Sequence, residues 1–202
     1  MIRYTMSALA FALMIAACSQ NIPAEPEKSV VTAEEMAANS ERLNAWFDEK
    51  FEEQLQFSPI SLTFLGRKDK NDEIDCFTLE CQDEQFNWMK SATEEMQQEF
   101  DYDALSPADQ ISYDIWEYQY KRAAEGQDYR YNGFVFDQMN GPQGFVPTFL
   151  MNFHPVDTAE DMTAYISRIR ASARALREGI DIAAEAAALG VHAPKFAYEG
   201  VI

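Results

Sequence analysis

Hydrophobic residues recur every three or four positions along most of the chain, which is the spacing of one face of an α-helix. The first such stripe consists of Leu43, Phe47, Phe51 and Leu55. Thr32 precedes it and Glu35 follows three residues later, a pattern typical of a capped helix start. The spacing therefore predicts a long helix that begins at Thr32 and turns this stripe toward a hydrophobic core.

Further helix starts follow along the chain. Ser58 and Ser106 are each followed by proline, and Thr78 precedes another periodic run, as expected of N-cap residues. Gly66 is expected to end the short helix over residues 60–65. The run after Thr78 carries Phe86, Met89, Thr93, Met96 and Phe100. Such a stripe is far more often core than a ligand groove.

The helix that follows Ser106 is expected to reach about Ala124 and to stop at Gly126. One of its faces carries Ile111, Ile115, Tyr118 and Arg122. Its other sides carry Tyr113, Trp116 and Tyr120. A helix that is apolar or aromatic on several sides is expected to be buried in a larger body.

Asp157 or Thr158 is expected to begin another helix, which Gly190 ends. One side of this helix carries Met162, Tyr165, Ile166 and Ile169, and the pattern resumes at Leu176, Ile180 and Ala184. Pro194 opens a last helix without a visible stop before Ile202. The fold class predicted is all-α, with antiparallel helical layers. We expect residues 32–202 to be the N-terminal helical portion of a larger protein, truncated at its C-terminus.

Helical periodicity breaks between residues 136 and 150, where two glycines and two prolines favour fixed turns. The side-chain amides of Gln138, Asn140 and Gln143 can each donate and accept hydrogen bonds. Such groups are suited to holding a peptide-like ligand and poorly suited to attacking one. The simpler explanation of this irregular loop is a turn between two helical layers.

The formal net charge of −18 disfavours a nucleic-acid partner, because phosphate would be repelled. The basic residues cluster at Arg168, Arg170, Arg174 and Arg177. Acidic residues lie three or four positions away at Glu178, Asp181 and Glu185. This spacing indicates ordinary surface pairs, with an anion or substrate carboxylate site as the alternative.

The chain offers few candidate metal ligands. His154 and His192 are its two histidines, and we interpret both as structural. Five potential oxygen ligands are spaced nearly as in a calcium-binding loop: Asp69, Asn71, Glu73, Asp75 and Glu80. Ile74 occupies the position at which that loop needs glycine, so we interpret this segment as a solvated loop.

The N-terminus has the layout of a secretory signal peptide over residues 1–17, with Arg3 before an apolar run. The run is too short to span a bilayer. Residues 15–18 end in Cys18 and resemble the bacterial lipobox, in which the cysteine is acylated and becomes the new N-terminus. The alternative is an ordinary signal peptide with an incidental cysteine. Residues 18–31 are expected to form a flexible tether.

A lipidated Cys18 would anchor the protein to a membrane of the cell envelope. Ser19 follows it, and by analogy with other lipoproteins this favours the periplasmic face of the outer membrane. Export would place Cys76 and Cys81 in an oxidising compartment, where they could form a disulfide or remain two thiols. A zinc site on these two cysteines alone would lack ligands.

Several ordered motifs resemble the N-terminal part of the domain of unknown function 885 family of bacterial proteins. The motifs are residues 57–66, Leu105-Ser106 with Ile111 and Tyr113, residues 140–143, and residues 165–169 and 177–180. The resemblance implies an exported lipoprotein similar to gluzincin-type zinc metallopeptidases, with a His-Glu-x-x-Pro-Gly-His-His motif in the C-terminal half. This chain contains no His-Glu pair, so the resemblance carries no catalytic or metal residue onto it. Zinc is expected only in a full-length protein.

Two functions are compatible with these features. The first is the N-terminal part of a lipid-anchored zinc peptidase, in which Gln138, Asn140 and Gln143 help to line a cleft for a peptide substrate. The second is a noncatalytic helical lipoprotein that binds a peptide or protein partner. A solute-binding lipoprotein is disfavoured, because such proteins alternate strands with helices and this sequence shows scarcely any strand periodicity.

Overall fold

The computed structural model describes residues 31–199 and 201. These residues form seven α-helices and two short 3-10 helices, with no β-strand among them, which confirms the all-α prediction. The predicted signal peptide over residues 1–17, the lipidation site Cys18 and all of the tether except Val31 lie outside the described residues. None of the described helices combines the length and the apolar character needed to cross a bilayer.

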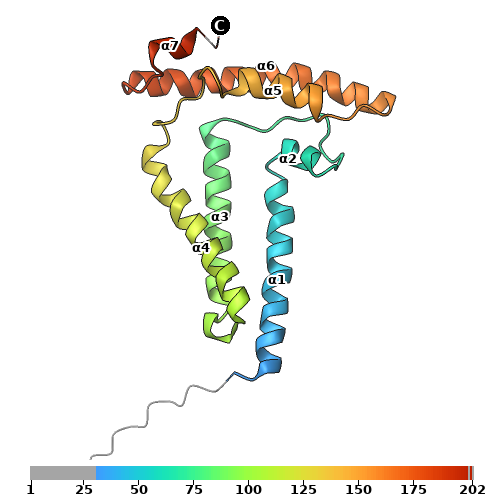
Figure 1. Ribbon diagram of the computed structural model, residues 1–202, viewed down its shortest axis with the longest axis vertical. Helices are drawn as coiled ribbons and strands as arrows, with labels where there is room; N and C mark the ends of the chain where they lie inside the picture. The colour runs from blue at the N-terminus through green and yellow to red at the C-terminus, as the bar shows by residue number, and fades with distance from the viewer. Residues whose placement is uncertain (1–30, 200, 202) are drawn as a thin grey trace, which may run out of the picture. The chain divides into compact units, whose positions relative to one another are not determined.

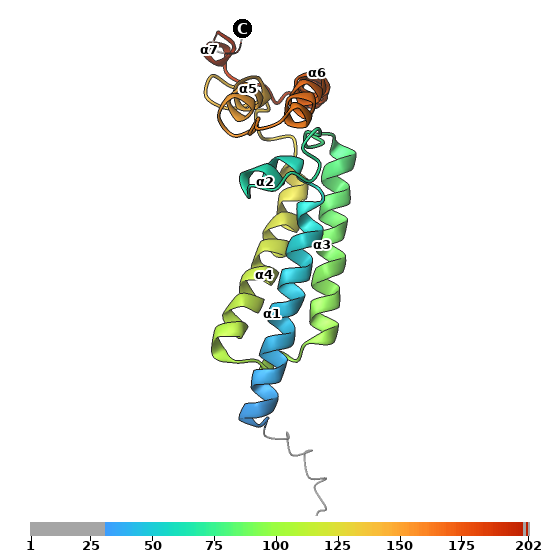
Figure 2. The same cartoon turned by 90° about the vertical axis from the view of Figure 1, so that its right-hand side faces the viewer.

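Helices α1 (Ala33–Leu55), α3 (Leu79–Glu99) and α4 (Pro107–Gly126) lie side by side, each antiparallel to the next along the chain (Figure 1 and Figure 2). They begin where the sequence predicts. Thr32 and Glu35 make both hydrogen bonds of a capping box. Thr78 and Ser106 each accept a hydrogen bond from the N–H three residues later. The 3-10 helix η1 (Tyr102–Ala104) precedes α4.

The last residue of α4 is Gly126, where the sequence predicts the helix to stop. Gly126 keeps a right-handed helical φ of −69°, and the chain continues directly into the 3-10 helix η2 (Gln127–Tyr129). By contrast, Gly66 and Gly190 follow α2 and α6 with φ values of 75° and 83°, as expected of helix-ending glycines.

The core between α1, α3 and α4 is rich in aromatic rings. Its buried residues are Leu43, Trp46, Ala92, Met96, Phe100, Leu105 and Tyr113. The ring of Trp46 lies 5.0 Å from that of Trp116 in an edge-to-face arrangement, a favourable geometry for aromatic pairs. Lys50 is buried beside this core, where it forms ion pairs with Glu53 and Glu95 at 3.1 Å each.

The apolar stripe of α1 is buried only in part, and one apolar face of α4 is exposed. In α1, Leu43 and Leu55 are buried as predicted, but Phe51 is half exposed. In α4, the exposed residues are Ile111, Ile115 and Tyr118, whereas Tyr113 is buried. The sequence predicts burial on several sides of α4, but apolar residues on several sides do not by themselves say which side meets the neighbouring helices.

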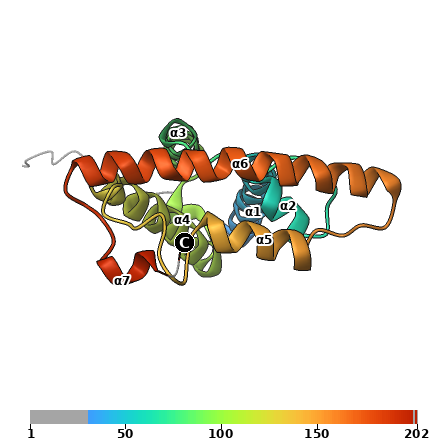
Figure 3. The ribbon, with the colours of Figure 1, turned by 90° about the horizontal axis from the view of Figure 1, so that it is seen from above.

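The other helices are α2 (Pro59–Phe64), α5 (Pro142–Asn152), α6 (Ala159–Ala188) and α7 (Lys195–Tyr198). Figure 3 shows α5 lying alongside the long α6. A second core joins α2, α5 and α6 to the segment before α3. Its buried residues are Ile60, Ile74, Val146, Phe149, Leu150 and Ala175.

The irregular loop predicted over residues 136–150 is irregular only in its first part. Pro142 is the first residue of α5, where its missing N–H removes no helical hydrogen bond. Gly141 precedes it with φ 129°. A side chain at Gly141 would place its first carbon 2.8 Å from the carbonyl oxygen of Val135, so only glycine fits here. The glycine and proline that predicted a turn are therefore the start signal of a helix.

Helix α6 turns its most apolar side outward. Met162, Ile166 and Ile169, predicted to share one side with Tyr165, are exposed. The buried positions are Asp161, Arg168, Ala175, Gly179 and Ala186. Small residues explain part of this orientation: a carbon added at Gly179 would lie 3.0 Å from the ring of Phe136, so the backbone there approaches its neighbour closely.

Arg168 is fully buried, which contradicts its prediction as a surface ion-pair partner. Its Nε donates to the carbonyl oxygen of Glu73 at 2.8 Å. Nη1 donates to Asn71 Oδ1 at 3.3 Å and to His154 Nδ1 at 2.8 Å. Nη2 donates to the carbonyl oxygens of Pro59 and Lys70, at 3.2 and 3.3 Å. One side chain of α6 thus holds α2 and the segment that links α2 to α3.

The start of α6 is held by a second polar group. Thr158 and Asp161 form its capping box. The Asp161 carboxylate also accepts a hydrogen bond from Lys68 Nζ at 2.8 Å and one from the N–H of Asp157 at 3.0 Å. The Lys68 ammonium contributes most to lowering the pKa of Asp161 to about 2, and the backbone N–H groups add to this effect.

We predict that Arg168→Met lowers the free energy of unfolding by about 3–5 kcal/mol, the cost of breaking a buried charged network. The substitution leaves buried carbonyl oxygens without donors. Arg168→Lys should restore little of the loss, because an ammonium cannot reproduce the planar fork of donors. Urea unfolding followed by circular dichroism measures both variants. The control is Arg177→Met, an exposed position, where a loss as large as that of Arg168→Met would contradict the assignment.

We also predict a stability change at acid pH. The folded pKa of Asp161 lies below its unfolded value, so its stabilising effect is complete above about pH 4 and is lost as the pH falls toward about 2. Asp161→Asn should lower stability at neutral pH and flatten the decrease between these pH values. Urea titrations at several pH values test this, with the exposed Asp128→Asn as control. An unchanged slope in Asp161→Asn would refute the prediction.

Candidate functional site

The three amides proposed as substrate-lining residues lie close in sequence but do not meet in one cavity. Gln143 lines a hollow of about 270 Å³ between α5 and α6. Asn140 lines a different hollow of about 560 Å³ together with Phe77 and Phe145. Gln138 is exposed and lines neither hollow. Their contact with a substrate stays a prediction.

Two of these amides have a structural task in the turn before α5. Gln143 Nε2 donates to the carbonyl oxygens of Asp137 and Asn140, at 2.9 and 3.1 Å. The backbone N–H groups of Met139 and Asn140 donate to Asp137 Oδ1 at 2.6 Å each, and they lower the pKa of Asp137. The Asn140 amide is also within 3.4 Å of the same carboxylate. These bonds satisfy several polar groups of the turn, whereas the buried Oε1 of Gln143 has no hydrogen-bond partner among the described residues.

A larger cleft opens elsewhere, between the end of α1, α2, the start of α3 and the end of α4. Its volume is about 610 Å³. Its apolar lining residues are Phe51, Leu55, Phe57, Phe64, Leu65, Phe86, Trp88, Met89 and Ala123. Its polar lining residues are Ser58, Ser61, Gln54, Gln82, Gln85 and Gln127. We call this the aromatic-amide cleft.

The walls of the aromatic-amide cleft are held in place by polar contacts behind them. Trp88 Nε1 donates to Glu53 Oε2 at 2.8 Å, and this bond is the main reason why the pKa of Glu53 is lowered. The ring of Phe57 packs against Trp88 with 5.8 Å between centroids. Ser58 Oγ caps α2 and lies 2.8 Å from Asp75 Oδ2, to which it donates. The cleft is thus largely pre-formed.

The residues that line the cleft include no ionisable side chain, although the chain carries a net charge of −18. The side chains of Gln54, Gln85 and Gln127 hydrogen-bond to no other described residue and are free to pair with a ligand. Ser58 and Ser61 hydrogen-bond to each other at 2.8 Å and have no histidine beside them in the lining. The cleft can bind a neutral ligand, and its lining holds no serine–histidine pair of the kind that activates a nucleophile.

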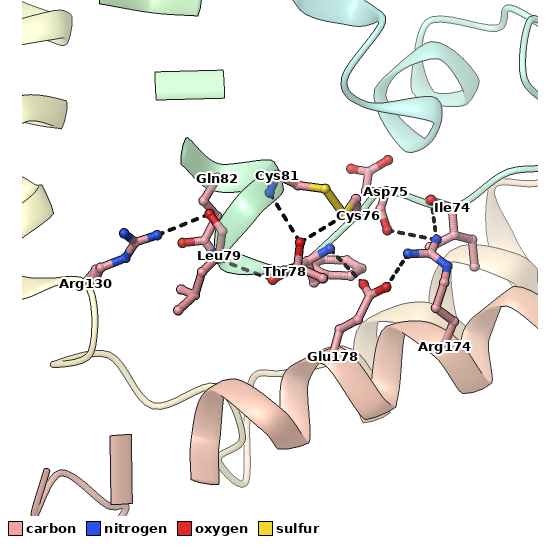
Figure 4. Close-up of a disulfide and its surroundings, with 11 residues drawn as sticks. Ile74, Asp75, Cys76, Thr78, Leu79, Cys81, Gln82, Arg130, Arg174 and Glu178 are labelled. Carbon is pink, nitrogen blue, oxygen red and sulfur yellow. Dashed lines mark hydrogen bonds and ion pairs between the residues drawn. A yellow bond between two sulfur atoms is a disulfide. The ribbon is translucent and has the colours of Figure 1, made fainter. Parts of the chain in front are cut away.

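The segment that leads into α3 is fastened by a disulfide and by α6 (Figure 4). Cys76 and Cys81, whose pairing the sequence left open, are joined in the structure. Arg174 of α6 donates to the carbonyl oxygen of Ile74 at 2.8 Å and pairs with Glu178 at 2.7 Å. Glu178 in turn accepts from the N–H of Phe77 at 2.9 Å. These contacts set the start of α3, which carries one wall of the cleft.

Potential metal ligands in the same segment are engaged within the protein. Asn71 Oδ1 accepts from Arg168, and Asp75 Oδ1 accepts from the N–H of Ile60 at 2.9 Å. The interpretation of this segment as a merely solvated loop is incomplete, because Asn71 and Ile74 are buried. No group of three or more His, Cys, Asp or Glu side chains among the described residues is placed to hold a metal ion.

His154 is buried and serves the Arg168 network. Arginine can only donate, so Nδ1 of His154 must accept and its Nε2 carries the proton, which points to the carbonyl oxygen of Asp161 at 3.3 Å. Burial lowers the pKa of His154 and favours this neutral form. His192 is exposed. Neither ring lines the aromatic-amide cleft.

The aromatic-amide cleft is not among the predicted sites, although one signal for it is present in the sequence. Gln82, Gln85, Phe86 and Met89 follow the spacing of one helix face, so amides and apolar groups share a side of α3. Phe86 and Met89 were assigned to the core with Met96 and Phe100. In the structure the stripe divides, because Met96 and Phe100 are buried while Phe86 and Met89 line the cleft.

The chain was compared with models of protein families, with curated proteins and with solved structures. The sequence model of a family described as bacterial protein of unknown function (DUF885) matches residues 59–202. No curated protein and no solved structure matches the chain.

Proposed function

Because the chain belongs to the DUF885 family of bacterial proteins, we propose that it forms the helical, peptide-binding part of an exported, lipid-anchored protein of peptidase type. The aromatic-amide cleft binds an uncharged, apolar stretch of a peptide. The zinc that the family resemblance implies finds no suitable ligand set among the described residues. We therefore assign no reaction step to the residues of this chain.

The observation that carries this proposal is the neutral lining of the aromatic-amide cleft. Its volume of about 610 Å³ falls in the range of small-ligand sites, roughly 300–1,000 Å³. Aromatic and aliphatic walls favour apolar side chains, whereas free amides can pair with the N–H and C=O groups of a peptide backbone. A charged ligand would lose its hydration there without gaining an opposite charge.

A second candidate function is supported by the lack of a base or metal ligand in the cleft lining. In that case the protein captures a peptide or a partner segment without cleaving it. The two candidates share the binding step and differ only in whether a bound peptide is cut. Mass spectrometry of the peptide after incubation with the full-length gene product distinguishes them.

We predict that Phe51→Ala and Gln85→Ala weaken binding of a neutral, end-capped peptide of leucine, phenylalanine and alanine, by about tenfold for Phe51→Ala. Phe51 is half exposed and Gln85 is exposed and unpaired, so neither change should disturb the fold. Fluorescence anisotropy of the labelled peptide measures the affinity.

The matched controls are Phe196→Ala and Gln98→Ala, at exposed positions away from the cleft lining. They should leave the affinity unchanged. Equal weakening by the cleft variants and the controls, or no binding by the unaltered protein, would overturn the assignment of the cleft. Circular dichroism shows whether each variant is folded.

The proposed lipid anchor makes a separate prediction. Acylation requires the Cys18 thiol, so Cys18→Ser should move the protein from the membrane fraction to the soluble fraction and abolish incorporation of labelled palmitate. Fractionation of cells that express the full gene tests this. Membrane partition that is unchanged in Cys18→Ser would count against lipidation and would leave the cleft assignment intact.

A further inference from the structure

The outer side of α6 carries an apolar seam that the described elements leave largely exposed. The seam residues are Met162, Ile166, Ile169, Ala173, Leu176 and Ile180. Their spacing alternates between four and three residues, the repeat by which one helix packs along another. Ile169 and Ile180 expose 49% and 56% of their surface. Over this stretch the seam is about 27 Å long at the rise of an α-helix.

Helix α5 turns part of this seam into a groove. The hollow of about 270 Å³ between α5 and α6 is lined by Ile169 and Leu176 from the seam and by Val146, Leu150 and Met151 from α5. Figure 3 shows the two helices side by side along this stretch. The surface is thus concave and apolar, and it runs parallel to α6, which suits a helical ligand.

One edge of the seam is basic on an otherwise acidic protein. Arg170 and Arg177, one heptad apart, each follow a seam residue and are exposed. Neither forms an ion pair with any described residue, whereas Arg168 and Arg174 of the same helix are used internally. In a coiled-coil arrangement these positions contact the flank of the partner helix.

We propose that the seam and the α5–α6 groove bind an amphipathic helix of another protein, whose apolar side packs on Ile169 and Leu176. The flank of that helix carries Asp or Glu opposite Arg170 and Arg177. The apolar contacts supply the affinity, and the two ion pairs select an acidic partner over a basic one. This surface is independent of the aromatic-amide cleft.

The charges argue against a second copy of the chain as the occupant. Antiparallel pairing of two α6 seams brings Arg170 of one copy beside Arg177 of the other, so like charges meet. Two copies, each with a net charge of −18, also repel one another. A membrane surface is disfavoured because a flat bilayer does not fill a groove between two helices.

The test uses the full chain and two designed peptides of about 21 residues, three heptads each. Both carry leucine at the seam-facing positions, and they differ only in having glutamate or lysine on the flanks. The anisotropy of the labelled peptides measures binding. The glutamate peptide should bind the unaltered protein more tightly, by about fivefold, as expected of two exposed ion pairs.

Two sets of variants locate the interaction. Arg170→Glu with Arg177→Glu should reverse the preference, so that the lysine peptide binds more tightly. Ile169→Asp should weaken both peptides by about tenfold or more, since it places a charge in the apolar contact. The controls are Lys121→Glu with Lys195→Glu and, for the apolar change, Ile111→Asp, all at exposed positions outside the seam. They should preserve the preference for glutamate.

Several outcomes would overturn the proposal. The proposal of a helical partner is refuted if the two peptides bind equally. It is also refuted if neither peptide binds to a protein that circular dichroism shows to be folded. A dimer in analytical ultracentrifugation that Ile169→Asp dissociates would identify a second copy as the occupant. Flotation with phosphatidylglycerol vesicles that is lost in Ile169→Asp would identify a membrane surface instead.

Discussion

The Arg168 guanidinium is the interaction on which the arrangement of α2, α5 and α6 depends. It is fully buried, and its donors reach three backbone carbonyls, an asparagine and a histidine. A buried charge is tolerated only when its hydrogen bonds are satisfied, so each of these partners must stay where it is. The ring of Phe149 on α5 lies 5.1 Å from the same guanidinium and completes its surroundings. The network therefore couples α6 to three other segments at one point.

The geometry of the aromatic-amide cleft depends on that network. Helix α2 and the start of α3 form two of its walls, and the segment between them is the one that Arg168 and Arg174 hold by its carbonyl oxygens. The Cys76–Cys81 disulfide closes the last turn of this segment onto α3. A cleft whose walls are set by buried polar contacts needs little rearrangement when it binds a ligand. Its uncharged lining also contrasts with the acidic surface around it.

The same constraint explains why the apolar seam of α6 faces outward. The side of the helix that carries Asp161 and Arg168 is buried, because these side chains form hydrogen bonds with groups of the segment between α2 and α3. Ala175 and Gly179 share that side and permit close packing. The bulkier Met162, Ile166 and Ile169 are left on the outside, which is an unusual distribution for a helix of a water-exposed protein. An exposed apolar patch of this kind is typical of a surface that binds another molecule.

Local sequence signals specify the helices and most of their ends. Thr32, Thr78, Ser106 and Thr158 cap helices because a side-chain oxygen can accept a nearby N–H whatever lies further away. The same local signals identified Gly66 and Gly190 as stops. Membership of the family also followed from short motifs in order along the chain.

Which face of each helix is buried depends on contacts between distant segments. Apolar residues lie on several sides of α4 and along one side of α6, and this pattern does not specify the neighbours of either helix. The exposed residues include Ile111 and Ile115 of α4 and Ile166 and Ile169 of α6. Arg168 and Glu178 looked like surface charges because their partners lie about a hundred residues earlier in the chain, in the segment that ends at Phe77. The aromatic-amide cleft likewise joins residues of four helices, none of which marks a site alone. Capping depends on contacts within one turn of helix, whereas burial and binding depend on contacts between segments, which no local pattern specifies.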